Sequence, residues 1–293
     1  MTKIKYQQIL MKIGIIGNGF VGKATQLIKC SMIDTMYIYD IVPEKCDPFG
    51  LTIDKFAECE LIFIALPTPM LTNGSCYTEN ICQCINNLKK IIQPELTSII
   101  LRSTVPPGTT ENLDVYFMPE FLTERNWASD FINCKNWIFG CDLSDINFIN
   151  KITKLFNHAH AEGVLKYNNL HFTTRKEAEL IKYVRNSFLA LKVSFFNEIA
   201  QFANIRGINF EEVRKLSTLD DRIGSSHSNV PGPDGLNGFG GTCLPKDAHC
   251  ILSEMINSGM ESYIIKAIID RNELVDRPQK DWLCDNGRVV MFK

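Results

Sequence analysis

Short apolar runs alternate with helical patterns through the first half of the chain. Residues 23–30 and 77–92 have helical patterns, and the turns after Leu66, Ser103 and Phe117 are polar or rich in proline. Strands that alternate with helices predict a parallel sheet with right-handed crossovers, and ligands bind at the carboxyl ends of its strands. The runs that we interpret as buried strands are Met11–Ile16, Met36–Tyr39, Leu61–Leu66, Ser98–Ser103, Val115–Phe117 and Trp137–Gly140.

The pattern changes near Thr173, where helical spacing replaces the alternation. Residues 175–205 contain neither proline nor glycine and predict one long helix, which Gly207 would end. A loop rich in glycine, serine, proline and aspartate covers residues 220–241. The further helices that we expect are residues 210–219, 247–260 and 262–275. No internal repeat or low-complexity tail is present.

A glycine motif follows the first expected strand. Gly17, Gly19 and Gly22 form G-x-G-x-x-G between that strand and a helix, with Phe20 and Val21 inside the motif. Such glycines allow a tight turn, close approach to a pyrophosphate and close packing of helix on strand. The motif therefore predicts a dinucleotide-binding, Rossmann-type doubly wound sheet.

Asp40 ends the second expected strand, about 20 positions past the glycines, where an acidic side chain can bind a ribose 2′-hydroxyl. Its charge would repel a 2′-phosphate, which favours NAD over NADP. The alternative is an ordinary turn residue before Pro43.

The most distinctive segment is Gly238–Asp247, which places one thiol, Cys243, in a glycine-rich loop. Lys246 and Asp247 follow it closely. A nearby cation favours the thiolate, which is the nucleophilic form of cysteine. The loop therefore suits covalent catalysis at a carbonyl group. The alternative is a buried structural cysteine in a glycine-rich turn.

Length and composition exclude several classes of protein. The 293 residues suffice for two domains, and the net charge of −2 gives no general attraction to nucleic acid or anionic membrane. No apolar run approaches the roughly 20 residues of a membrane-spanning helix. Met1–Leu10 is polar, lacks the apolar core of a signal peptide, and is expected to be an extension ahead of the first strand.

The chain contains 11 cysteines, without a Cys-x-x-Cys pair, and its few histidines are not spaced as metal partners. We interpret the cysteines as reduced thiols in a cytoplasmic environment, and we expect no metal site.

Four further positions have both a functional and an ordinary interpretation. Lys182 and Asn186 lie four residues apart, on one face of the long expected helix. Glu120 and Glu124 are also four apart and form either a solvated helical face or a pair of acid/base carboxylates. Thr104 directly follows a strand, at the ligand-binding end. Arg222 is either a surface charge or an anion clamp.

Together these motifs resemble the UDP-glucose/GDP-mannose dehydrogenase family, and most closely its UDP-glucose 6-dehydrogenase branch. The resemblance covers roughly residues 11–275. Its motifs occur in order along the chain: Gly17-x-Gly19-x-x-Gly22, Pro67-Thr68-Pro69, Ser103–Gly108, Pro119–Leu122, the Lys182/Asn186 helix, Asp221–Gly224 and the Cys243 loop. Residues 230–235 fit the substrate loop of the branch.

The resemblance implies a two-domain arrangement like that of 6-phosphogluconate dehydrogenase. We expect an NAD-binding domain at residues 11–172, a helical dimerisation domain with the cysteine loop at 173–275, and a short tail at 276–293. It implies a homodimer built from the long helices. Family members continue further, with a domain that grips the nucleotide, whereas this sequence stops at Lys293. Asn286–Phe292 would be the first strand of that domain, in a chain that is either truncated or naturally short.

The resemblance also implies a reaction, the oxidation of the C6 alcohol of UDP-glucose to a carboxylate in two hydride transfers to NAD. Cys243 would attack the aldehyde, and the resulting thiohemiacetal would be oxidised to a thioester. Lys182 and Asn186 would stabilise oxyanion character. Asp247 would organise water or assist proton transfer, and Glu124 would be the base for hydrolysis.

The remaining roles also come from the resemblance. Thr104 would hold a water, and Glu120 would orient the sugar and its proton network. Arg222 would reach the product carboxylate from a neighbouring subunit. The other expected cofactor contacts are Pro67, Thr68, Thr104 and Lys246, and the other expected substrate contacts are Phe121, Leu122, Phe239 and Gly240.

Three other functions stay open at this point. The first is the same chemistry on GDP-mannose or a UDP-N-acetylhexosamine. The second is a catalytically weak NAD-binding protein with a regulatory or scaffolding role. The third is a two-domain dehydrogenase of small 3-hydroxy acids, which would need no thiol.

Overall fold

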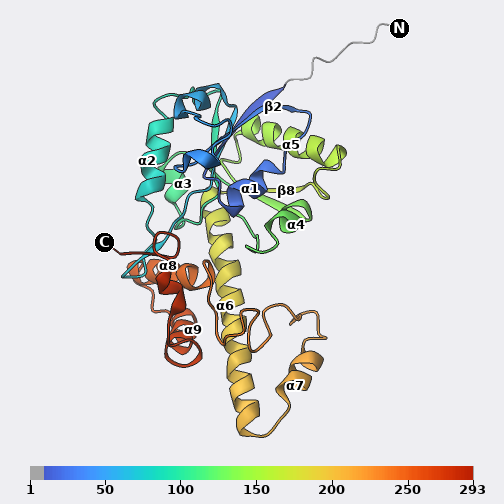
Figure 1. Cartoon of the computed structure of the whole chain (residues 1–293), viewed down its shortest axis with the longest axis vertical. Coiled ribbons are helices and arrows are strands. Elements are labelled where there is room, and N and C mark those ends of the chain that lie inside the picture. The colour runs from blue at the N-terminus through green and yellow to red at the C-terminus, as the bar shows by residue number, and fades with distance from the viewer. Residues whose placement is uncertain (1–9, 293) are drawn as a thin grey trace. The chain divides into compact units, whose positions relative to one another are not determined.

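The computed structural model describes residues 10–292 (Figure 1). The chain folds into two compact units. The first unit comprises residues 10–67 and 78–182, and the second comprises residues 68–77 and 183–292. The expected N-terminal extension lies, except for Leu10, outside the described residues.

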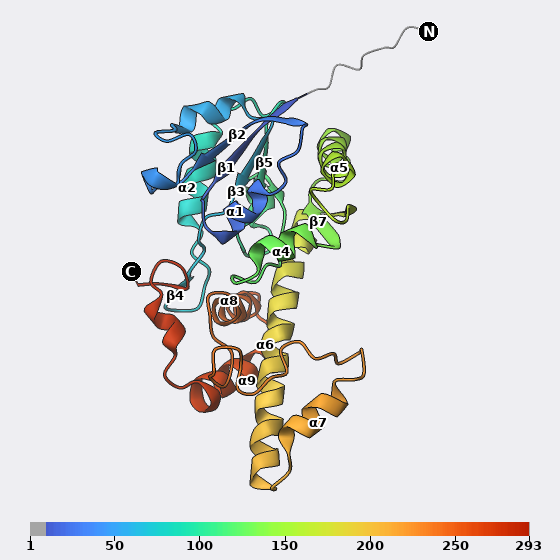
Figure 2. The ribbon, with the colours of Figure 1, turned by 45° about the vertical axis from the view of Figure 1, so that its right-hand side comes forward.

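The first unit is built on a seven-stranded sheet with the strand order β2-β1-β3-β5-β6-β7-β8 (Figure 2). Its strands are β1 Met11–Ile16, β2 Ile33–Tyr39, β3 Leu61–Ile64, β5 Ser98–Leu101, β6 Tyr116–Phe117, β7 Asn136–Gly140 and β8 Asn169–Thr173. The pairs β1–β2, β1–β3, β3–β5, β5–β6 and β7–β8 are parallel, as the alternating pattern predicts.

The β6–β7 pair is antiparallel, which corrects the expectation of an entirely parallel sheet. Phe117 pairs with Gly140 in this short ladder. The connection between the two strands contains only the six-residue helix α4, Trp127–Ile132. It does not carry the chain back across the sheet, so β7 runs opposite to β6.

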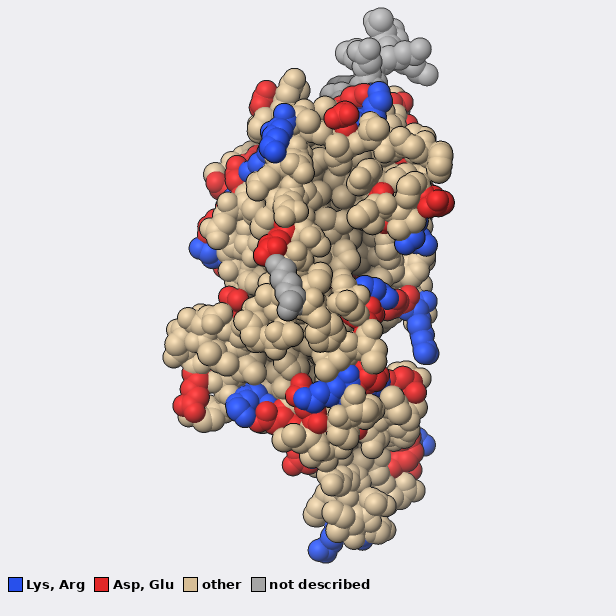
Figure 3. Space-filling model, turned by 60° about the vertical axis from the view of Figure 1, so that its left-hand side comes forward, with Lys and Arg blue, Asp and Glu red and all other residues tan. Residues whose placement is uncertain are grey.

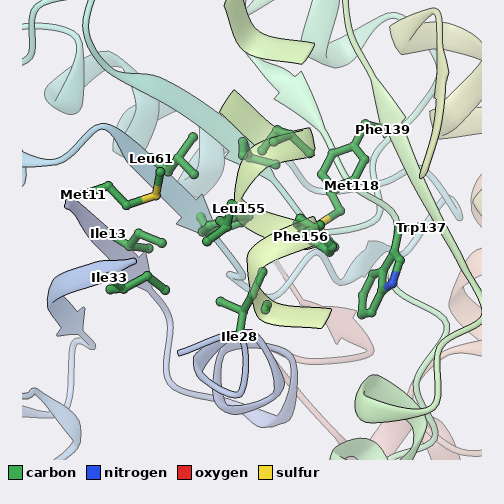
Figure 4. Close-up of a cluster of buried hydrophobic side chains, with 14 of the residues drawn as sticks. Met11, Ile13, Ile28, Ile33, Leu61, Met118, Trp137, Phe139, Leu155 and Phe156 are labelled. Carbon is green, nitrogen blue, oxygen red and sulfur yellow. The ribbon is translucent and has the colours of Figure 1, made fainter. Parts of the chain in front are cut away.

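Alternate residues of the central strands are buried on opposite faces of the sheet, so both faces carry a core. Ile13 and Phe63 belong to one apolar cluster, whereas Ile62 and Leu101 belong to the other. Figure 4 shows the first cluster, in which Phe156 packs beside strand residues. This burial on both faces explains why the strands read as continuous apolar runs.

Helices cover the two faces of the sheet. Helices α1 (Phe20–Gln26) and α5 (Ile146–Ala161) contribute to the first cluster, and α2 (Glu79–Leu88) contributes to the second. Helix α5 was not predicted from the sequence, although Phe148, Ile152 and Leu155 show helical spacing. The remaining short elements of this unit are η1 Pro43–Lys45, η2 Ile53–Glu58 and α3 Thr109–Asn112.

The long expected helix is confirmed as α6, Arg175–Ile205, and its residues belong to both units. The second unit also contains α7 Phe210–Ser217, α8 Leu244–Asn257, α9 Ile264–Arg271, a π-helical turn η3 Asn272–Asp276 and a 3₁₀ turn η4 Asp281–Cys284. Helix α8 begins three residues before the expected start because Cys243 is its N-cap and Pro245 lies in its first turn.

A two-stranded parallel sheet interrupts the otherwise helical second unit. It pairs β4 (Met70–Leu71) with β9 (Val290–Met291). A strand is therefore present within residues 286–292, where the first strand of a further domain was expected, and in this structure it pairs with the segment 68–77 of the second unit. No helix within residues 10–292 is long and apolar enough to cross a bilayer.

Candidate active site

The glycine loop between β1 and α1 has little room for side chains. A Cβ atom at Gly22 would lie 1.8 Å from the carbonyl oxygen of Gly17. Gly17 has a φ of +93°, a conformation that other residues rarely adopt. At Gly19, in contrast, a Cβ would meet nothing within 4 Å. The loop is therefore tight where it packs on itself and open at its middle glycine.

Asp40 holds this loop from the end of β2. Its carboxylate accepts a hydrogen bond from the Asn18 backbone N–H at 2.7 Å and another from Val42 N at 3.0 Å. Helix α1 begins at Phe20 with Gly19 as its N-cap and without a side-chain cap. Backbone N–H groups at the open Gly19 position, with a carboxylate nearby, fit the diphosphate and ribose of a dinucleotide. The residues present thus fit the cofactor that the motif predicts.

The other residues expected to contact the cofactor belong to different units of the structure. Thr104 is buried in the loop after β5, and Pro67 ends the first segment of the first unit, after β3. Thr68 is also buried but belongs to the second unit, as does Lys246. The structure therefore divides the expected cofactor contacts between the two units.

Glu179 was not identified by the sequence analysis, yet it positions the Thr104 loop. This fully buried α6 residue accepts hydrogen bonds from Gly108 N at 2.5 Å and from Thr110 N and Oγ1, both at 2.7 Å. Burial raises the pKa of its carboxyl group, and these bonds oppose that effect. A Glu among lysines on a helix gives no sequence signal for such a role.

Lys182 and Glu120 form a buried ion pair in the first unit. The Lys182 Nζ donates to Glu120 Oε1 and to the Glu120 backbone oxygen, both at 2.6 Å, and it lies 5.6 Å from the centre of the Phe121 ring. Burial by itself would raise the pKa of Glu120, but the Lys182 charge outweighs it, and the pKa lies below its usual value. Glu120 is thus held as a carboxylate.

Glu120 and Glu124 do not lie on a helix, so the interpretation of the pair as a solvated helical face is wrong. Residues 118–123 form irregular backbone, in which Glu120 Oε2 accepts a hydrogen bond from Leu122 N at 2.8 Å. Glu124 lies in an exposed turn. Glu120 is buried and Glu124 is exposed because the chain after β6 follows an irregular path instead of continuing into a helix.

Cys243 lies at the N-terminus of α8, in the second unit. Its side chain is partly exposed, and Lys246 and Asp247 follow within the first turn of the helix. The N-terminal end of a helix favours a negative charge, which suits a thiolate nucleophile. The alternative of a fully buried structural cysteine does not hold.

Asp247 is the centre of a buried polar network beside this thiol. Asn186 Nδ2 on α6 donates to Asp247 Oδ2 at 2.5 Å, and Lys246 Nζ donates to Asp247 Oδ1 at 2.5 Å. Burial alone would lower the pKa of Lys246, but the acidic groups of Asp247, Cys243 and Cys250 outweigh it and raise the pKa. The chain thus holds a lysine cation next to the candidate nucleophile.

Two asparagine side chains hydrogen-bond the thiol loop from elsewhere in the second unit, and Arg277 packs closely against it. Asn197 Oδ1 accepts from Gly238 N at 3.1 Å, and the fully buried Asn272 exchanges two hydrogen bonds with the Phe239 backbone, at 2.8 and 2.9 Å. A Cβ at Gly240 would lie 2.4 Å from the Arg277 guanidinium carbon. No sequence motif marks Asn197, Asn272 or Arg277, so none of them was predicted as a site residue.

Arg222 lies on the surface of the second unit. Its side chain is 89% exposed and forms an ion pair with Asp220 at 2.5 Å. On the face shown in Figure 3, basic and acidic side chains are interspersed rather than gathered by sign. Within residues 10–292, no group of three or more His, Cys, Asp or Glu side chains is arranged to hold a metal ion.

Two family models match the chain over more than half of its length. Residues 49–160 match the NAD binding domain of the UDP-glucose/GDP-mannose dehydrogenase family, and residues 176–274 match its central domain. The chain belongs to this family. The second match includes Lys182, Asn186 and the whole Cys243 loop, and the first implies NAD as the cofactor.

Named relatives agree with this assignment. A putative UDP-glucose 6-dehydrogenase of Bacillus subtilis is 30% identical over 230 residues, which are 74% of this chain and 51% of that protein. The UDP-glucose 6-dehydrogenase of Rickettsia prowazekii is 30% identical over 75% of this chain and 51% of that protein. The chain therefore spans about half the length of these relatives.

The fold is also that of solved nucleotide-sugar dehydrogenases. A UDP-glucose dehydrogenase from Pyrobaculum islandicum superposes with a TM-score of 0.79 at 24% identity, covering 93% of this chain and 70% of that one. At this identity the likeness supports the doubly wound sheet with its long helix, and says nothing of the substrate.

Proposed function

We propose that this chain is an NAD-dependent nucleotide-sugar dehydrogenase that oxidises UDP-glucose to UDP-glucuronate. The observation that carries the proposal is Cys243 at the start of α8, next to the buried network of Asn186, Lys246 and Asp247. Dehydrogenation of an alcohol needs no thiol. A four-electron oxidation to an acid does benefit from one, because the thiol can trap the aldehyde.

Bound NAD would supply the hydride acceptor that takes the alcohol to the aldehyde and the thiol adduct to a thioester. Gly17, Gly19, Phe20, Val21 and Gly22 would hold its diphosphate, and Asp40 its ribose. Pro67, Thr68, Thr104 and Lys246 would complete the cofactor contacts. The open Gly19 position supports this assignment.

The thiolate of Cys243 would attack C6 of the aldehyde to form a hemithioacetal, and water would later cleave the thioester. Two of the three Lys182 N–H donors bind Glu120 in the described structure, which leaves one for an oxyanion. Asn186 keeps a second amide N–H beyond the one given to Asp247. Asp247 would orient the water, because its carboxylate is fixed by two donors.

The other expected roles remain proposals. Glu124 would act as base from its exposed turn, and Thr104 would hold a water. Glu120 would orient the sugar and its proton network, and its hydrogen bond from Lys182 fixes the position of that lysine. Phe121, Leu122, Phe239 and Gly240 would contact the sugar nucleotide, with Arg222 reaching it from a second subunit. The thiol chemistry suits a reducing compartment such as the cytoplasm.

We also propose that the chain forms a homodimer through α6. Val184, Phe188, Phe195 and Phe202 are each more than half exposed, and their spacing of four, seven and seven residues places them on one face of the helix. Such a stripe of large apolar side chains is typical of an interface. This exposed apolar stripe on α6 supports a second copy of the chain as the partner.

The first test is the amount of NADH formed per UDP-glucose consumed, in wild type beside Cys243→Ala. We expect two NADH per sugar in wild type, and no completion to the acid in the variant. Cys284→Ser, which removes an exposed thiol of the same unit, should behave as wild type. Full conversion by Cys243→Ala would contradict the covalent mechanism.

The substrate is tested separately by comparing kcat/KM for UDP-glucose, GDP-mannose and a UDP-N-acetylhexosamine. A solved UDP-N-acetylmannosamine dehydrogenase from Pyrococcus horikoshii shares the fold at a TM-score of 0.73 and 22% identity, which is why this panel is needed. A clear preference for another sugar would keep the chemistry and replace the substrate. NAD binding without turnover of any sugar would contradict the proposal.

A further inference from the structure

The segment 69–77, hereafter the hairpin 69–77, folds back on itself and packs on α8. Leu71 N donates to Ser75 O at 2.7 Å, and Tyr77 N donates to Pro69 O at 2.8 Å. At Gly74, a Cβ would lie 3.5 Å from the Cβ of His249. The hairpin thus contacts the same helix that begins at Cys243, within the second unit.

This contact brings together two cysteines that the sequence separates widely. Cys76 lies opposite Met70 in the hairpin, and Cys250 lies on α8. Both contribute to one apolar cluster with Met70 and the fully buried Tyr183, and their thiols are hydrogen-bonded to each other. Both are present as reduced cysteines.

The two thiols differ in exposure and acidity. Cys76 is partly exposed, whereas Cys250 is 1% exposed. The hydrogen bond with Cys250 is the main cause that lowers the pKa of Cys76, and the Lys246 charge adds to it. The same hydrogen bond and burial raise the pKa of Cys250. A half-buried cysteine whose thiol pKa is lowered and that lies next to a second thiol fits a peroxide-sensitive pair.

We propose that Cys76 and Cys250 form a redox pair, in which a peroxide oxidises Cys76 and Cys250 then closes a disulfide. The Cys76 sulfur attacks one peroxide oxygen and becomes a sulfenic acid, and the O–O bond breaks with release of water. The Cys250 sulfur then attacks the Cys76 sulfur and expels a second water. Two thiols lose two hydrogens in total, and hydrogen peroxide is reduced to two waters.

The disulfide would tie the hairpin 69–77 to α8 two helical turns after Cys243. Lys246 and Asp247 lie on α8 between Cys243 and Cys250, so a disulfide at Cys250 would border the network beside the Cys243 thiol. The inference is independent of the proposed reaction, because the disulfide is detected by mass and requires neither NAD nor a sugar.

The test treats the purified full chain with hydrogen peroxide, blocks the remaining thiols by alkylation, and maps disulfide-linked peptides by mass spectrometry without reduction. We expect a Cys76–Cys250 peptide that disappears after dithiothreitol. Cys76→Ser and Cys250→Ala should both lose this peptide. The matched control Cys284→Ser, which removes an exposed thiol of the same unit, should keep it.

The order of the two steps is tested with dimedone, which reacts with sulfenic acids. In Cys250→Ala we expect dimedone at Cys76, and in Cys76→Ser we expect an unmodified Cys250. Circular dichroism of each variant shows that it is folded. The proposal fails if wild type gives no Cys76–Cys250 peptide at peroxide doses that modify Cys243. Dimedone on Cys250 but not on Cys76 would also overturn the proposed order.

Discussion

Gly19 and Gly22 belong to the same motif but are required for different reasons. Gly22 packs against the Gly17 carbonyl oxygen, so any side chain there displaces the loop, whereas Gly19 faces open space with ordinary backbone angles. Substitution by alanine therefore separates two reasons for glycine, which are close packing of the loop at Gly22 and close approach of a ligand at Gly19.

We expect Gly22→Ala to destabilise the first unit and to abolish NAD binding, because the new Cβ would lie 1.8 Å from backbone oxygen. Gly19→Ala should keep its stability within about 0.5 kcal/mol, the usual range for a surface change, while NAD binds more weakly. Urea unfolding and NAD titration calorimetry measure the two effects. Unchanged NAD affinity in Gly19→Ala would show that the diphosphate does not approach this glycine.

Helix α8 is joined to the two turns that follow α9 by a small charged cluster. His249 Nε2 lies 2.9 Å from Glu273 Oε1, and Lys280 Nζ lies 2.5 Å from Glu273 Oε2. The hydrogen bond with His249, followed by that with Lys280, lowers the pKa of Glu273 to about 2 from an ordinary value of 4.5. A carboxylate with a lowered pKa stabilises the folded state above its unfolded pKa and loses that effect as the pH falls.

Glu273→Gln tests this cluster through the pH dependence of stability. Above pH 4.5 the variant should be less stable than wild type by on the order of 1–2 kcal/mol, after allowance for solvent screening. The difference should shrink between pH 4.5 and about 2, where wild-type Glu273 becomes protonated. Denaturant unfolding across this range measures it, with the exposed Glu95→Gln as control. A pH-independent difference would refute the assignment.

The apolar stripe on α6 predicts the oligomeric state. Because Phe188 and Phe195 are exposed on one face of the helix, Phe188→Asp/Phe195→Asp should convert a dimer to a monomer without unfolding it. Analytical ultracentrifugation measures the mass. Phe49→Asp, at a similarly exposed apolar residue of the first unit, should leave the mass unchanged. Equal masses for wild type and the double variant would argue against an interface here.

At the scale of the whole molecule, each unit has its own core. The second unit depends on segments from far apart in the sequence, since β4 pairs with β9, and Trp282 and Val289 fill the cluster that contains Met70. The Trp282 indole N–H is buried without a hydrogen-bond partner in the described chain. Residues near the C-terminus therefore complete the unit that carries Cys243.

We expect Trp282→Ala to lower the stability of the second unit by about 3–5 kcal/mol, the usual cost of a large cavity. NAD affinity should stay the same, because the glycine loop belongs to the first unit. Trp282→Phe removes the buried N–H and keeps a ring, so its cost should be much smaller. Urea unfolding and NAD calorimetry check this. An equal loss in both variants would exclude the cavity as the cause.

Local patterns predicted the parts of the site that depend on short stretches of sequence. The G-x-G-x-x-G loop, the buried strands and the bounds of α6 follow from backbone chemistry and helical or strand spacing, which neighbouring residues determine. The direction of β7 and the helix α5 were missed. The direction of β7 depends on how its connection crosses the sheet, which local sequence does not determine, whereas α5 has apolar residues at helical spacing and was open to prediction.

The sequence by itself predicted the fold class and the family, and it supplied the candidate chemical residues, because short motifs and local hydrophobic spacing depend on neighbouring residues. Only the tertiary structure showed that Glu120 pairs with Lys182, that Asn186 and Lys246 share Asp247, and that Asn272 holds the thiol loop. It also placed Cys76 against Cys250. These partners are separated by long stretches of chain, and they meet because burial of apolar surface brings their elements together and leaves each buried polar group needing a partner.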